Sequence, residues 1–62
     1  VVPALSRSLA EDPSPIVRGQ AAWALGRLGG AEARAALDGR ISSEPDAWAR
    51  GEIETAMETL LE

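Results

Sequence analysis

The sequence predicts an all-α fold, an α-solenoid fragment made of two helix–turn–helix repeats, and three observations lead to that prediction. Apolar residues recur at helical spacing in four segments, and Pro, Ser and Gly stand where those segments begin and end. The chain also matches itself at an offset of 32 residues, a period typical of stacked helix pairs. We therefore expect four helices, with residues 1–30 forming one repeat and residues 31–62 a second repeat that acts as a C-terminal cap.

The first repeat is predicted from the residues at its helix ends. A short helix is expected near residues 2–10 and a longer one near residues 14–28. The longer helix begins at Ser14, whose hydroxyl can accept from a free N–H group of the first turn, and at Pro15, which suits the first helical position. It ends at Gly29-Gly30, where left-handed dihedrals are tolerated. The predicted apolar positions are Leu5 and Leu9, then the stripe Val17, Ala21, Ala24 and Leu28, with Leu25 beside it.

The second repeat is predicted from the alignment at an offset of 32. Its helices fall near residues 31–42 and 46–61. The Asp-Pro turn and the Arg18-Gly19 pair both recur 32 residues later, as Glu44-Pro45 and Arg50-Gly51. A helical apolar pattern alone would rarely reproduce both of these features. The predicted apolar positions are Ala33, Leu37, Ile41, Ile53, Ala56, Met57, Leu60 and Leu61.

Three glycines inside the predicted helices call for a packing explanation. Gly19 and Gly51 occupy equivalent places in the two repeats, and Gly26 lies two turns beyond Gly19. Each glycine costs a helix roughly 0.5–1 kcal/mol relative to alanine. We therefore expect a neighbouring backbone to approach each of these positions too closely for a methyl group.

Length and composition limit the kinds of protein this chain can be. It contains no Cys and no His, so it has no disulfide, no thiolate zinc site and no cysteine-held iron–sulfur cluster. No run of about 18 apolar residues is present, so no contact with a membrane is predicted. Because so short a chain without such a staple rarely forms a sufficient core, and because it begins Val1-Val2-Pro3, we expect a piece of a larger array. Its N-terminal edge, Val1, Val2 and Leu5, is then expected to be exposed or covered by self-association of the isolated fragment.

The charges are distributed unevenly along the chain. Residues 1–43 carry a net charge of +1 and residues 44–62 a net charge of −5, and all six basic residues are arginine. Glu54 and Glu58 lie four residues apart, but a charged outer helix face explains them more simply than a pair of catalytic carboxylates. We therefore predict no catalytic residue and no metal site, and we expect a nucleic acid to approach only the first three helices.

A second stripe on the longer helix of the first repeat carries the candidate binding residues. Ile16, Gln20, Trp23 and Arg27 recur at steps of four, three and four residues. An aromatic residue at position 23 either packs against an adjoining repeat or contacts a partner. Trp48, near the start of the last helix, is predicted to be a core aromatic residue.

The string from Val17 to Gly29, VRGQAAWALGRLG, preceded by Asp12-Pro13, resembles the HEAT-like repeat signature. The resemblance implies that the longer helix of each repeat lines an inner, concave surface. It also implies a structural ladder, meaning charged contacts between neighbouring repeats, made by an acidic residue and an arginine six positions later. In this sequence the ladder residues are Asp12 with Arg18, and Glu44 with Arg50.

Residues 12–30 are also similar to the C-terminal HEAT-like region of the epoxyqueuosine reductase family. That resemblance implies a cytoplasmic oxidoreductase that uses cobalamin and two 4Fe–4S clusters and acts on the wobble position of a tRNA in queuosine biosynthesis. The cofactors would belong to the N-terminal catalytic part of the same chain, and none to the present fragment. We expect the fragment to help dock tRNA, with Arg27 and Arg34 on phosphates, Gln20 and Trp23 beside them, and the acidic last helix facing away. The alternative is a structural or protein–protein interaction scaffold with no nucleic-acid role.

Overall fold

The computed structural model describes residues 1–61, and within that range the chain forms four helices and no strand. The helices are α1 (Val2–Glu11), α2 (Pro15–Leu28), α3 (Ala31–Ile41) and α4 (Ala47–Leu61). The all-α prediction is therefore confirmed, with boundaries within about one residue of those expected. Glu62, which the sequence places in the last helix, lies outside the described residues. None of the four helices is both long and apolar enough to cross a membrane.

The ends of α2 and α4 are fixed by local contacts. Ser14 Oγ accepts from the backbone N–H of Val17 at 3.4 Å, so Ser14 is the N-cap of α2, as predicted. The helix stops where Gly29 and Gly30 adopt φ angles of +71° and +94°, which a side chain would disfavour. At the start of α4, Asp46 Oδ2 accepts from the N–H of Ala49 at 2.9 Å.

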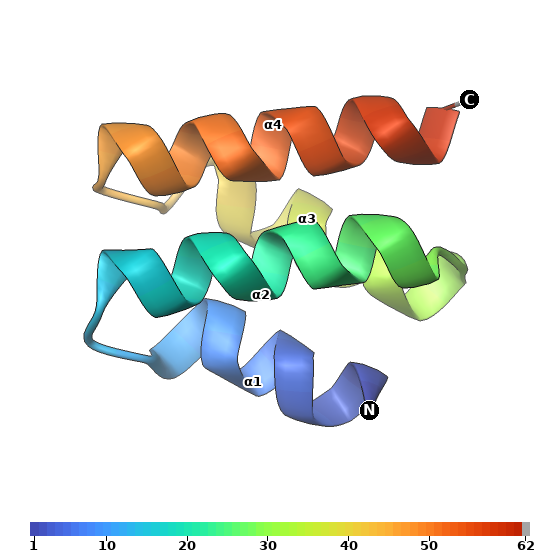
Figure 1. The fold of residues 1–62 in the computed structure, drawn as a ribbon, viewed down its shortest axis with the longest axis horizontal. Coiled ribbons are helices and arrows are strands. Elements are labelled where there is room, and N and C mark those ends of the chain that lie inside the picture. The colour runs from blue at the N-terminus through green and yellow to red at the C-terminus, as the bar shows by residue number, and fades with distance from the viewer. Residues whose placement is uncertain (62) are drawn as a thin grey trace.

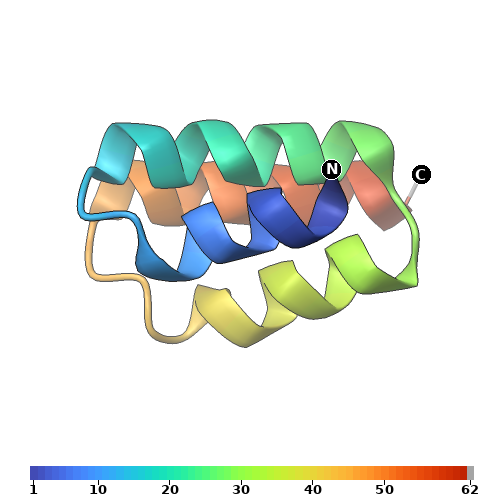
Figure 2. The ribbon, with the colours of Figure 1, turned by 90° about the horizontal axis from the view of Figure 1, so that it is seen from below.

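The helices form two layers. In Figure 1, α2 and α4 lie side by side and run in the same direction, as the repeat predicts. Figure 2 shows that α1 and α3 form the second layer, each returning against the longer helix of its own repeat. The contact between α2 and α4 is the most extensive in the molecule, followed by that between α1 and α2. The two repeats are thus stacked mainly through their longer helices.

The core lies between the two layers. Leu9, Leu25, Leu37 and Ile53, one from each helix, are fully buried. Small residues complete this core cluster, namely Ala21, Ala22, Ala33 and Ala56. The alanines allow the helices to approach closely, and the larger side chains fill the centre.

The predicted buried stripe of α2 is wrong at both ends. Val17 is 40% and Leu28 is 53% exposed, whereas Arg18 and Ala22 are buried. The buried face of α2 is rotated by about one residue because α4 covers the side that carries Arg18 and Ala22. Steps of three and four residues fit two adjacent stripes of a helix equally well, and only the neighbouring helices decide between them.

The N-terminal edge is also less exposed than expected. Val1 is 83% exposed, but Val2 and Leu5 are half-buried against the core cluster of the chain itself. At the other end, Leu61 is 71% exposed and takes no part in the core. The chain therefore covers part of the apolar surface that the sequence assigned to a missing neighbour.

The three helical glycines have three different surroundings. A Cβ on Gly26 would lie 2.8 Å from Cβ and 3.0 Å from Cα of Ala56, so the expected close backbone approach is confirmed there. A Cβ on Gly19 would instead collide with the ring of Trp48, which is a side chain and not a backbone. No atom of the described residues lies within 4 Å of a Cβ on Gly51, so the prediction is wrong at that position.

Candidate functional site

A buried ion pair joins the two repeats. Arg18, on α2, donates from Nε to Oε1 of Glu44 at 2.8 Å and from Nη2 to Oε2 at 2.9 Å. Two further donors reach the same carboxylate: Arg40 Nε at 3.2 Å and the backbone N–H of Asp46 at 3.0 Å. The Glu44 side chain is completely buried. Its burial is tolerated because four donors replace the water that the carboxylate loses.

The electrostatic consequence is a strongly perturbed carboxyl group. The hydrogen bond from Arg18 is the main cause that lowers the pKa of Glu44 to about 2, and the Asp46 N–H and Arg40 act in the same direction against the effect of burial. The pKa of Arg18 is raised, chiefly by its hydrogen bond to Glu44. Every buried polar side-chain atom of the described residues has a hydrogen-bond partner. A cluster in which all groups are charged and paired is suited to structure and leaves no group free for acid–base chemistry.

The other contacts of the ladder residues run through the backbone. Arg18 Nη1 donates to the carbonyl oxygen of Asp12 at 2.8 Å. In the same manner, Arg50 donates from Nε and Nη2 to the carbonyl oxygen of Glu44, at 3.2 and 2.9 Å. Within each repeat, the arginine therefore binds the carbonyl of the acidic residue, and the carboxylate of Glu44 pairs with the arginine of the other repeat.

The α2 stripe, defined as Ile16, Gln20, Trp23 and Arg27, lies on the surface. Ile16 is 58% and Trp23 is 55% exposed, and Gln20 and Arg27 are also exposed. The guanidinium carbon of Arg27 lies 5.7 Å from the centroid of the Trp23 ring, which is the geometry of a cation–π contact. Arg27 thus holds its charge against a flat aromatic surface while both side chains remain accessible.

Trp48 extends this surface from the neighbouring helix. The ring was expected in the core, but it is 45% exposed and lies across Gly19 of α2. Gly19 is one helical turn before Trp23, so both tryptophans lie against the same side of α2. Sequence reasoning missed this arrangement, although a glycine at position 19 was the signal that a large group covers it.

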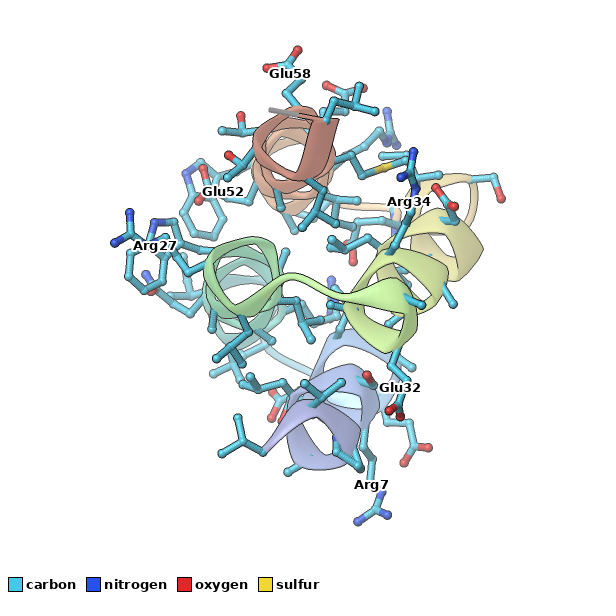
Figure 3. The ribbon with its side chains drawn as sticks, turned by 90° about the vertical axis from the view of Figure 1, so that its right-hand side faces the viewer. Arg7, Arg27, Glu32, Arg34, Glu52 and Glu58 are labelled. Carbon is cyan, nitrogen blue, oxygen red and sulfur yellow. The ribbon has the colours of Figure 1, made fainter. Side chains whose placement is uncertain are left out.

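The two arginines expected to contact phosphates do not share a surface. Figure 3 shows Arg27 and Arg34 on opposite sides of the bundle. Arg34 belongs to α3 and lies beside Met57, Leu60 and Leu61, near the end of α4. The same view places Glu52 of α4 on the side of Arg27. The acidic last helix therefore does not face away from the α2 stripe as a whole.

No metal-binding arrangement is found among residues 1–61, where no group of three or more Asp, Glu, His or Cys side chains could hold an ion. What remains is a rigid, all-helical unit: two stacked helix pairs, an internal ion pair between them, and an exposed aromatic surface on their longer helices. A unit of this design is an α-solenoid module, in which each helix pair rests on the next.

Comparison with known proteins places this module in a family. The family model described as HEAT repeats matches residues 1–58, and the chain belongs to this family. It is 37% identical over 59 residues to an epoxyqueuosine reductase of Bacillus subtilis, covering 95% of this chain and 15% of that protein. It is 42% identical over 45 residues to an epoxyqueuosine reductase of Listeria monocytogenes, covering 73% of this chain and 12% of that protein.

A third relative has no assigned function. The chain is 37% identical over 59 residues to an uncharacterized protein of Geobacillus stearothermophilus, covering 95% of this chain and 27% of that protein. No solved structure matches the chain. The chain therefore spans between about one eighth and one quarter of the length of these relatives, and their names describe proteins much longer than this module.

Proposed function

We propose that this chain is a non-catalytic HEAT-repeat module of a tRNA-modifying enzyme of the epoxyqueuosine reductase type, and that it helps to dock the substrate tRNA. The similarity to such reductases over 95% of the chain carries the first part of the proposal. The iron–sulfur clusters, the cobalamin and the reduction itself then belong to the catalytic part of a cytoplasmic parent enzyme. The exposed, rigid α2 stripe supports the second part.

The contact is assigned to one side of the module only. Arg27 is the single arginine of the α2 stripe, and its planar guanidinium can bind a phosphate in two-pronged fashion. Gln20, two turns earlier, offers a neutral donor and acceptor, and the Trp23 ring between them can stack on a sugar or an unpaired base. Arg34, on the opposite side, cannot join the same contact.

This separation gives the experiment a matched control. In the full-length enzyme, Arg27→Glu is expected to weaken tRNA binding and to reduce the slope of log affinity against log salt by about one. Arg34→Glu makes the same change of charge on the far side and is expected to leave both quantities unchanged. Binding is measured by fluorescence anisotropy at several salt concentrations, on enzyme with its cofactors loaded and with an unchanged melting temperature.

Two results would count against tRNA docking by this face. One is an Arg27→Glu enzyme that binds tRNA with unaltered affinity and salt slope. The other is an Arg34→Glu enzyme that loses as much affinity as Arg27→Glu, since a general effect of charge would then replace a local contact. In either case the module would retain only its role as a scaffold.

A protein-binding scaffold is the second candidate, and the composition of the exposed face favours it. Ile16, Trp23 and Trp48 place apolar surface beside one arginine and one glutamate, Arg27 and Glu52. Exposed aromatic groups of this kind are typical of protein interfaces. If this reading is correct, Trp23→Ala changes the assembly state of the parent protein in sedimentation, and tRNA affinity stays the same.

A further inference from the structure

The interface between the two repeats provides a template for a surface that is still uncovered. On the α4 side it consists of Glu44, which receives Arg18, and of Trp48, Ala49 and Ala56, which face α2. Subtracting the offset of 32 gives the equivalent positions of the first repeat. These are Asp12, Ile16, Val17 and Ala24, and they define what we call the outer face of α2.

Asp12 repeats the local bonding of Glu44 but lacks its arginine. Asp12 Oδ1 accepts from the N–H of Ser14 at 2.9 Å, as Glu44 Oε2 accepts from the N–H of Asp46 at 3.0 Å. Among the described residues, no donor reaches the second carboxylate oxygen of Asp12, whereas Glu44 is bound on both oxygens. Asp12 is thus oriented by its own turn in the way that Glu44 is when it receives a guanidinium.

An open hollow adjoins this carboxylate. It is lined by Ala4, Arg7, Ser8, Glu11, Asp12 and Pro13. Two members of this set, Ser8 and Asp12, correspond at the offset of 32 to Arg40 and Glu44, which belong to the buried charge cluster of the second repeat. The position that a guanidinium fills beside Glu44 is therefore open beside Asp12.

The rest of the outer face is apolar and exposed. Ile16 is 58% and Val17 is 40% exposed, while Ala49, the counterpart of Val17, is completely buried under α2. From these observations we infer that the outer face of α2 is a docking surface for a further helix pair of the same type. The second helix of that partner supplies an arginine to the Asp12 carboxylate and small residues to the surface around Val17.

A second copy of this chain does not meet that description. Its available helix face is that of α4, where Arg50-Gly51 corresponds to Arg18-Gly19. One and two turns further on, however, Glu54 and Glu58 stand at the places of Ala22, which is fully buried, and Gly26, which has no room for a methyl group. Two carboxylates at these points would be buried without partners, and this prevents α4 from packing as α2 does.

The test extends the chain by one helix pair. A second copy of residues 1–32 is joined in front of Val1, so that the added copy of Arg18 can reach Asp12. The extended chain is expected to unfold in one transition with a higher midpoint and a steeper dependence on urea. Asp12→Asn keeps an oxygen for the Ser14 N–H but removes the charge. In the extended chain it is expected to lower the folding equilibrium constant about tenfold or more, and in the 62-residue chain less than about threefold.

The control is Glu11→Gln, which removes one negative charge from an exposed neighbouring residue and is expected to have equal, small effects in both chains. The inference is overturned if the extended chain unfolds in two separate transitions or fails to fold, or if Asp12→Asn has the same effect in both chains. It is also overturned if the 62-residue chain dimerises in sedimentation and Asp12→Asn dissociates the dimer, because a second copy would then be the occupant.

Discussion

Replacing Gly26 by alanine tests the helix contact on which the stacking of the two repeats depends. The added Cβ would lie 2.8 Å from Cβ of Ala56, 3.0 Å from its Cα and 3.3 Å from its carbonyl oxygen. The optimal separation of two carbon atoms is about 3.5–4.0 Å. Since two of these atoms belong to the backbone of α4, the strain cannot be relieved by rotating a side chain, and α2 and α4 must move apart.

The magnitude follows from two opposing effects. Forcing a methyl group into a well-packed contact costs about 1–3 kcal/mol. Removing a glycine from the interior of a helix returns roughly 0.5–1 kcal/mol. We therefore expect Gly26→Ala to lower the free energy of unfolding by about 1–2 kcal/mol, which for a domain of this size lowers the melting temperature by roughly 5–15 °C.

The matched substitution is Gly51→Ala, which gains the same helix propensity and meets no atom of the described residues within 4 Å. It is expected to raise the melting temperature by about 2–6 °C. Both variants are followed by circular dichroism during heating and in urea. If Gly26→Ala were as stable as the original chain or more so, the close approach of α2 to Ala56 would not limit packing, and the account of the stacking would be wrong.

Three further predictions concern the charge cluster and the helix start. Glu44→Gln leaves Arg18 buried without a counter-charge and is expected to lower the melting temperature by at least about 10 °C, whereas exposed Glu54→Gln changes it little. Because the pKa of Glu44 is depressed to about 2 from an ordinary 4.5, the stability that this carboxylate contributes is complete above pH 4.5 and is lost as the pH falls towards 2, as urea titrations at each pH would show. Asp46→Ala removes the bond to the Ala49 N–H and should cost about 1 kcal/mol in the same assay.

The sequence predicted the helices well because their ends are determined locally. Ser14 accepts a hydrogen bond from the first turn of α2, and Gly29 and Gly30 terminate it with positive φ angles. These contacts involve residues within three or four positions of each other, so the sequence alone contains the relevant information. The repeat at an offset of 32 then predicted the parallel arrangement of α2 and α4, since equivalent helices of stacked units point the same way.

The candidate surface was less predictable because it depends on contacts between distant residues. Which side of α2 is buried is decided by α4, and this displaced Val17 and Leu28 from the expected core. Trp48 lies over Gly19, 29 residues earlier in the chain, and no local pattern indicates that pairing. Arg27 and Arg34 are close in sequence, but the turn between α2 and α3 carries them to opposite sides of the bundle.

The charges on the α2 stripe also limit what docking by this module can accomplish. A single phosphate contact through Arg27 would make the affinity fall only about three- to fourfold between 50 and 200 mM salt, and Glu52 lies on the same side of the bundle. Such a contact adds little to the total binding energy of a tRNA. It can, however, fix orientation, because Arg27 is held against the Trp23 ring on a helix that is packed on three sides. A rigid module with one well-placed arginine is therefore better suited to setting the position of a tRNA already held elsewhere than to capturing it from solution.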